Sequence, residues 1–189
     1  MRKRWMAAMV AAVVSCGNAM AVDLEAYVRQ EMFGDIILSP DGEYLAATVP
    51  GEDYTGLVIL RTADHKMVST TRPPRNNHVS DVRWVSDSRV VFGLAEKFGQ
   101  RDQPSLTGEL MAMNADGGRA ELLVGYRVQG RGPGTRIQPK KVEAVAAFLT
   151  DDLPDDDRNV IIAVSPFTED PFTRAERMDT QTGKRVVIA

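Results

Sequence analysis

The stretch from Ile36 to Val49 reads IILSPDGEYLAATV and carries the clearest structural signal in the chain. Two short apolar runs flank the sequence SPDG at residues 39–42. An Asp-Gly pair between such runs is typical of a tight β-hairpin, because glycine readily adopts the positive φ that the turn needs. The stretch therefore predicts two antiparallel strands joined by a turn.

The same pattern continues and then recurs along the chain. Strand-like runs at residues 55–60 and 67–70 extend the hairpin to a four-stranded unit. The sequence VRWVSDSRVVF at residues 82–92 begins a second unit, and RVVIA at residues 185–189 ends a third. Four-stranded units that recur about every 50 residues are typical of β-propeller blades.

We therefore predict an all-β fold, a partial β-propeller of about three four-stranded antiparallel blades preceded by a short helix. Asp23 is the expected N-cap of that helix, and Leu24, Tyr27 and Val28 follow it at helical spacing. Closed propellers usually have four to eight blades, so we expect the chain to be part of a longer protein. The expected segments are a signal peptide at 1–21, the helix at 22–34, and an incomplete propeller at 35–189 with blades at 35–73, 78–125 and 143–189 and a glycine-rich, basic insertion at 126–142.

The N-terminus has the pattern of an export signal. The basic residues Arg2–Arg4 precede the uncharged apolar run Trp5–Ser15, and Ala19-Met20-Ala21 fits the small-x-small site that signal peptidase cleaves. The apolar run is shorter than the roughly 20 residues that a membrane-spanning helix needs. This pattern predicts an exported protein, periplasmic or secreted.

Cys16 leaves a second possibility open at the same terminus. It is the only cysteine, and Val13-Val14-Ser15-Cys16 also fits a bacterial lipobox, in which the cysteine is lipidated. Lipidation would give a membrane-tethered lipoprotein, whereas cleavage after Ala21 would give a mature chain without cysteine and therefore without disulfides.

Composition narrows the classes of partner. The net charge is −3 and 43% of residues are hydrophobic, which suits a globular core and argues against a general nucleic-acid binder. We expect membrane contact only if Cys16 is lipidated.

Two motifs resemble a known family. Residues 37–46 resemble the SPDG strand-turn-strand of TolB-like propellers and of the N-terminal propellers of prolyl oligopeptidase-family serine peptidases. Residues 82–92 look like the next copy of that motif. A signal, a short helix and then such blades are similar to the start of exported bacterial members, the acylaminoacyl- and dipeptidyl-peptidase-like ones.

The resemblance implies a role without chemistry of its own. In that family the propeller covers a C-terminal α/β-hydrolase domain, restricts the access of peptides, and leaves the catalytic serine to a G-x-S-x-G elbow in the hydrolase. No G-x-S-x-G occurs in this sequence, so no catalytic residue carries over. We expect a scaffolding and gating segment whose partner is a hydrolase domain and whose parent protein acts on peptides. The alternative is a non-enzymatic TolB-like binding module.

Glu169 and Asp170 are the candidate substrate-binding residues. They lie in the predicted loop from Phe167 to Phe172. The resemblance suggests their role, because dipeptidyl peptidases of this family hold the free amine of the substrate with propeller carboxylates, and paired acids complement an ammonium group. The other interpretation is an exposed loop.

The remaining polar groups predict no metal site and no cofactor. His65 falls in a predicted turn, and His78 falls in a connection between blades, where it would face a partner or simply solvent. The acidic run Asp151–Asp157 lacks the order of an EF-hand loop and reads as a hairpin turn. Basic residues of the insertion, Arg127 among them, would bind an acidic partner or lie in a solvated loop.

Overall fold

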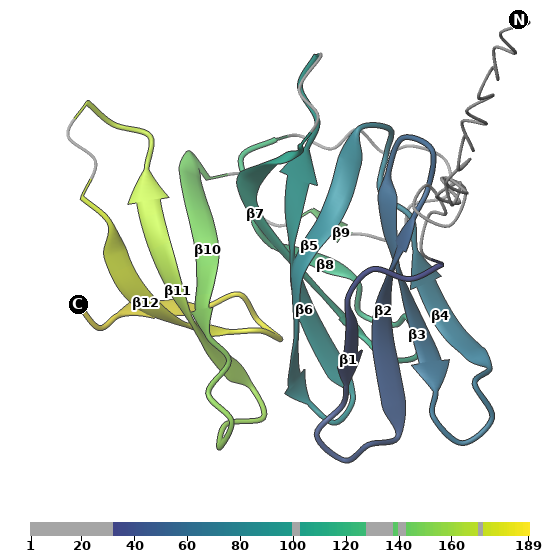
Figure 1. The fold of residues 1–189 in the computed structure, drawn as a ribbon. Helices are drawn as coiled ribbons and strands as arrows, with labels where there is room; N and C mark the ends of the chain where they lie inside the picture. The colour runs from purple at the N-terminus through teal and green to yellow at the C-terminus, as the bar shows by residue number, and fades with distance from the viewer. Residues whose placement is uncertain (1–31, 100–102, 128–137, 140–142, 170–171) are drawn as a thin grey trace, which may run out of the picture. The chain divides into compact units, whose positions relative to one another are not determined.

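The computed structural model describes residues 32–99, 103–127, 138–139, 143–169 and 172–189. All regular structure in these ranges is β-strand, in agreement with the predicted all-β class (Figure 1). Within them no helix is long and apolar enough to span a membrane. The strands are β1 (Ile36–Leu38), β2 (Tyr44–Pro50), β3 (Thr55–Arg61), β4 (Met67–Thr71), β5 (Asn77–Ser86), β6 (Arg89–Glu96), β7 (Ser105–Asn114), β8 (Glu121–Val124), β9 (Gln138–Pro139), β10 (Val145–Asp151), β11 (Asn159–Pro166), β12 (Arg174–Asp179) and β13 (Arg185–Val187).

The first strand set, β1–β4, grows from the SPDG turn as an antiparallel meander. Gly42 adopts a φ of 76°, a left-handed conformation that disfavours any residue with a Cβ. The Ser39 hydroxyl donates a hydrogen bond to Asp41 Oδ1 at 2.6 Å and accepts one from the backbone N–H of Tyr44 at 2.9 Å. The bond from Ser39 and a second from the Glu43 N–H hold the pKa of Asp41 below its usual value. The turn is therefore fixed by its own side chains.

The second strand set, β5–β8, is also an antiparallel meander. One parallel register pair, Thr55↔His78, joins its first strand to β3 of the first set. The short strand β9 extends β8 in parallel. The two sets therefore form one nine-stranded sheet, and β10–β13 form a separate four-stranded antiparallel sheet.

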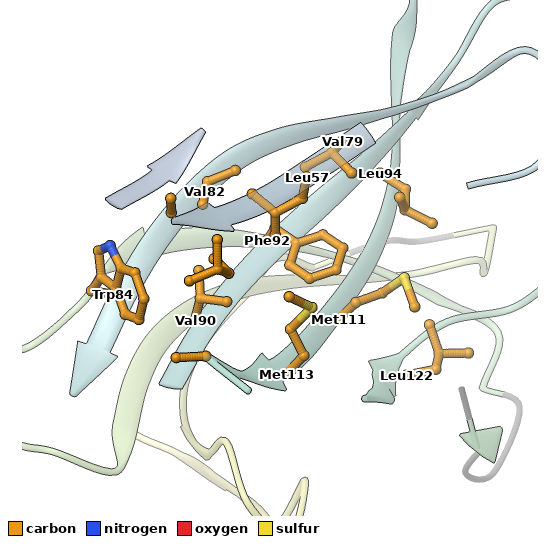
Figure 2. Packing of buried hydrophobic residues seen from close by; sticks show 13 residues of the cluster. Leu57, Val79, Val82, Trp84, Val90, Phe92, Leu94, Met111, Met113 and Leu122 are labelled. Carbon is orange, nitrogen blue, oxygen red and sulfur yellow. The ribbon is translucent and has the colours of Figure 1, made fainter. Parts of the chain in front are cut away.

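Two apolar cores hold the three strand sets together. The first lies between the first and second sets, where Figure 2 shows the Phe92 ring beside Met111 and Met113. The second lies between the second set and the β10–β13 sheet, where Val91 and Ile162 are completely buried. Strand β6 contributes to both cores because alternate residues point to opposite faces, so it is apolar on both sides. Each fully buried side chain of this size stabilises the fold by roughly 1.5–3 kcal/mol.

The predicted fold class is wrong in two respects. No residue in the described ranges is helical; Met32–Gly34, the end of the expected helix 22–34, is irregular, and residues 22–31 lie outside those ranges. The structure also does not consist of three separate blades, because the Thr55↔His78 pair merges the first two strand sets into one sheet. Neither of the two described sheets closes on itself. The short connection 72–76 explains the merger, since it brings the start of β5 alongside the start of β3.

Candidate functional site

Several connections meet at one end of the strands, which we call the loop end. It consists of the described residues 51–54, 72–76, 97–99, 125–127 and 167–169. The register pairs Thr55↔His78 and Asn77↔Glu96 place the first three connections at the same end of the nine-stranded sheet. The last two meet where the Tyr126 and Phe167 rings contact edge to face, with centroids 4.9 Å apart.

Arg127 is the centre of a charged network at the loop end. Its Nε donates to Glu109 Oε2 at 2.6 Å, and its Nη2 donates to the same oxygen and to Asn77 Oδ1, the latter at 3.0 Å. Its Nη1 pairs with Glu96. One guanidinium thus joins the segment that follows β8 to the strands β5, β6 and β7.

The charges of this network are largely shielded from solvent. The side chain of Glu109 is 0% exposed and that of Arg127 is 23% exposed. Burial by itself would lower the pKa of Arg127, but the hydrogen bond and charge of Glu109 outweigh it and raise that pKa above its usual value. A buried carboxylate is tolerated only when it is paired and hydrogen-bonded. The network therefore ties residues 125–127 to strands β5, β6 and β7 through ion pairs and hydrogen bonds.

The sequence interpretation missed this arrangement. Arg127 was expected to bind an acidic partner or to lie in a solvated loop, and the structure places it half-buried against Glu109 instead. A signal was present in the run GELMAM at residues 108–113, where one glutamate stands inside an otherwise apolar strand. A charge in such a position needs a partner of opposite sign.

His78 lies beside this network, where the two strand sets join. Its Nδ1 is 2.9 Å from the Thr55 hydroxyl oxygen, and its Nε2 is buried without a hydrogen-bond partner among the described residues. Burial lowers the pKa of His78, Lys97 lowers it further, and Asp53 opposes both. His78 therefore favours the neutral form and stabilises the junction. His65 is exposed in the turn between β3 and β4, with a φ of 54°.

Glu169 lies exposed in the connection after β11, and its predicted companion Asp170 lies outside the described residues. Exposed aromatic side chains occupy the same end of the strands, Phe98 after β6 and Phe167 and Phe172 around Glu169. Exposed aromatic groups beside an exposed carboxylate suit contact with a peptide or another protein domain.

The acidic run between β10 and β11 is tied to its own hairpin. Asp156 accepts hydrogen bonds from the Asn159 side-chain amide at 3.0 Å and from the Arg158 N–H at 3.0 Å, and it pairs with Arg177. Burial alone would raise the pKa of Asp156, but the hydrogen bonds from Asn159 and Arg177 lower it to about 2. Across the described ranges no three acidic, histidine or cysteine residues are grouped as a metal site would need. Cys16, the predicted signal peptide and the glycine-rich part of the insertion at 128–137 lie outside those ranges.

Comparison with known proteins gives no family. No family model matches the chain, and no curated protein matches it. Among solved structures, an apo structure of the AtxE2 isopeptidase is similar with 12% identity and a TM-score of 0.35, over 81% of this chain and 33% of that one. A puromycin-hydrolysing peptidase of Mycobacterium tuberculosis is similar with 11% identity and a TM-score of 0.26, over 84% of this chain and 29% of that one.

Both of these structural neighbours are peptidases at low identity, and this chain spans about a third of their length.

Proposed function

We propose that this chain is the N-terminal β-sheet segment of an exported prolyl oligopeptidase-like serine peptidase. In this proposal the segment supports a hydrolase domain and gates the access of peptides to it. The residues that carry the resemblance, 37–46 and 82–92, form β-hairpins in the structure. The chain contributes no nucleophile elbow, so the peptide bond is cleaved by the hydrolase domain and not by this segment.

The loop end is the observation that supports a gating role. A segment that restricts the access of peptides needs a rigid framework and an exposed surface that contacts the peptide or the hydrolase domain. The Arg127–Glu109 network supplies the framework, because one guanidinium joins the start of β5 and the end of β6 to Glu109 of β7. The exposed side chains of Phe98 and Phe167 supply the contact surface.

Export is part of the same proposal. The basic start, the short apolar run and the Ala19-Met20-Ala21 site support it, with lipidation at Cys16 as the competing form. The two forms differ in one measurable property, since a diacylated cysteine would keep the protein in the membrane fraction after a high-salt wash, whereas cleavage after Ala21 would release it.

The gating proposal is tested by size-selective hydrolysis. The hydrolase domain, expressed from the same gene, is assayed alone and together with this chain on a small ester and on peptides of increasing length. We expect the chain to leave the ester rate unchanged and to slow cleavage of the longest peptides at least tenfold. Phe98→Glu should weaken this size selection, whereas Ala63→Glu, in the exposed turn at the opposite end of the strands, should not. Equal rates with and without the chain, for every peptide length, would remove the gating role.

The second candidate is a non-enzymatic TolB-like binding module, which the same SPDG hairpin supports. It predicts further four-stranded units in the reading frame and no G-x-S-x-G motif. Reading the gene past the codon for Ala189 separates the two candidates, because a hydrolase domain is compatible only with the first.

A further inference from the structure

The ring of Tyr54 packs closely against two glycines at the loop end. A Cβ on Gly51 would lie 2.4 Å from this ring, closer than two such atoms can approach, and a Cβ on Gly56 would lie 3.5 Å from it. Position 51 therefore needs a residue without a side chain while the ring stays where it is. The ring is held in a defined place beside the start of β3.

Arg72, the residue after β4, stacks on this ring. The central carbon of its guanidinium lies 4.2 Å from the ring centroid, within the range of a cation–π contact. A stacked guanidinium keeps its N–H donors at its edges, where they match the two oxygens of a carboxylate. Arg72 is exposed, and no hydrogen bond or ion pair joins its side chain to another described residue. Its donors are thus oriented by the ring and available to a ligand.

Two further cations lie in the connections next to Arg72. Arg75 pairs through Nε with Asp53, while its side chain remains 86% exposed. The N–H of Asn76 donates to the Asp53 carbonyl at 2.6 Å, and the Asn76 carbonyl accepts from the N–H of Lys97 at 2.8 Å. These backbone bonds join the connections 51–54, 72–76 and 97–99. We call Arg72, Arg75 and Lys97 the basic cluster.

The charges around the basic cluster indicate what it can bind. The three connections carry three cations and two carboxylates, a net charge of +1 in a chain whose net charge is −3. Asp53 is already paired with Arg75, but Glu52 is exposed and would repel a broadly acidic surface. A single carboxylate meets Arg72 without that cost. Phe98, which is 51% exposed and directly follows Lys97, offers an apolar contact to the molecule that carries the carboxylate.

We propose that the basic cluster binds a single carboxylate of a peptide, at the peptide's C-terminus or on an acidic side chain. Arg72 donates paired N–H groups to the carboxylate, Arg75 and Lys97 add positive charge, and Phe98 contacts the apolar part of the peptide. This inference rests on the proposed contact of the loop end with peptides. It deepens the gating role by naming a chemical feature of the peptides that are held.

Peptide titrations of the purified chain at low ionic strength, followed by amide NMR, test the proposal. The probes are an N-acetylated tetra-alanine with a free C-terminus, the same peptide with an amidated C-terminus, and the amidated peptide with one internal glutamate. We expect the first probe to shift the amide signals of residues 51–54, 72–76 and 97–99, and the second to leave them in place. Shifts with the third probe would show that a side-chain carboxylate suffices, and their absence would assign the site to the C-terminus. Both results support carboxylate binding, which added salt should weaken.

Variants separate the role of Arg72 from a general effect of charge. Arg72→Met should weaken binding of the free-carboxylate peptide about tenfold, because it removes charge-assisted hydrogen bonds. Arg72→Lys should restore binding only in part, because an ammonium neither stacks on Tyr54 nor presents paired donors. Arg61→Met is the matched control, since Arg61 forms an exposed pair with Asp64 in the turn at the opposite end of the strands. Glu52→Gln should tighten binding, because it removes the neighbouring negative charge.

Two results would overturn the proposal. One is an amidated peptide without glutamate that binds as tightly as the peptide with a free carboxylate. The other is an Arg72→Met chain that binds as the Arg61→Met chain does, with near-ultraviolet circular dichroism of buried Trp84 showing that both are folded. Neither result affects the gating role, because size selection is measured separately with the hydrolase domain and is expected for amidated peptides as well.

Discussion

At the scale of single residues, Glu109 and Arg127 illustrate how a buried charge controls the loop end. Glu109 is enclosed completely, and Arg127 reaches it from the residues after β8. A buried ion pair adds little net stability compared with apolar residues of similar volume, but removing one member leaves a charge without a partner. The pair therefore makes the local backbone intolerant of change at either position.

The substitution Arg127→Met should lower the free energy of unfolding by about 3 kcal/mol, because it leaves the Glu109 carboxylate buried and unpaired. Urea unfolding measures the change. Arg83→Met is the control: the Arg83–Asp81 pair is exposed and is expected to contribute less than about 1 kcal/mol. Adding Glu109→Gln to Arg127→Met should recover part of the loss. Equal effects of Arg127→Met and Arg83→Met would contradict the assigned role of the network.

His78 makes a prediction about pH. Its pKa is lower in the folded protein than in the unfolded chain, where an ordinary histidine titrates near 6.5, so the unfolded chain binds more protons. The stabilisation from His78 is therefore fully present above its unfolded pKa and is lost as the pH falls below it. Unfolding free energies between about pH 8 and 5.5 should fall less steeply for His78→Gln than for the wild type. His65→Gln, in the exposed turn between β3 and β4, is the matched control substitution. A slope that His78→Gln does not alter would disprove this account.

At the scale of elements, the strands could be predicted from the sequence, but the pairing between strands of different sets could not. The SPDG stretch predicted strands at 36–38 and 44–49, and they lie at Ile36–Leu38 and Tyr44–Pro50. Alternation and turn chemistry act over a few residues, so sequence reveals them. The Thr55↔His78 pair depends on how two strand sets meet, which no local pattern encodes. The helix prediction failed in its last residues because its apolar stripe was short and rested on spacing alone.

The candidate site was less predictable than the strands. Glu169 was predicted from the family resemblance and from its loop; it is exposed, and its role stays a prediction. The Arg127 network was missed because its members come from separate strands, and only the isolated glutamate of β7 pointed to it. Sequence identifies a charge that needs a partner, whereas the fold decides which partner it meets.

Arg89 joins the two sheets and gives a prediction at this scale. Although only 3% exposed, it donates to the Thr180 carbonyl from Nη2 at 2.7 Å and from Nε at 3.2 Å. Arg89→Ala should cost about 3 kcal/mol, since it removes charged hydrogen bonds and leaves a buried carbonyl unsatisfied. Hydrogen exchange should show protection lost first in β12 and β13. Arg61→Ala is the control, because Arg61 forms an exposed pair with Asp64 and its loss should have little effect on stability. If Arg89→Ala instead lowered hydrogen-exchange protection equally across both sheets, Arg89 would not act as a local connection between them.

At the scale of the whole molecule, the described strand sets form a framework, and in our proposal the loop end is the surface that contacts the substrate. The sheets are held by two apolar cores and by Arg89, and ion pairs such as Arg127–Glu109 and Arg177–Asp156 add to them. Such a framework suits positioning and selection better than chemistry. In the proposed peptidase, the segment described by this structure controls the access of peptides, and a separate hydrolase domain cleaves them.

Labelling of the native protein tests this division most directly. The protein that carries this sequence is isolated from its source cells with an antibody against residues 143–189, treated with a fluorophosphonate probe and digested for mass spectrometry. The account predicts an exported polypeptide longer than this chain, labelled on one serine within a G-x-S-x-G peptide. Recovery of a protein in which no serine is labelled, from any cell fraction, would contradict it.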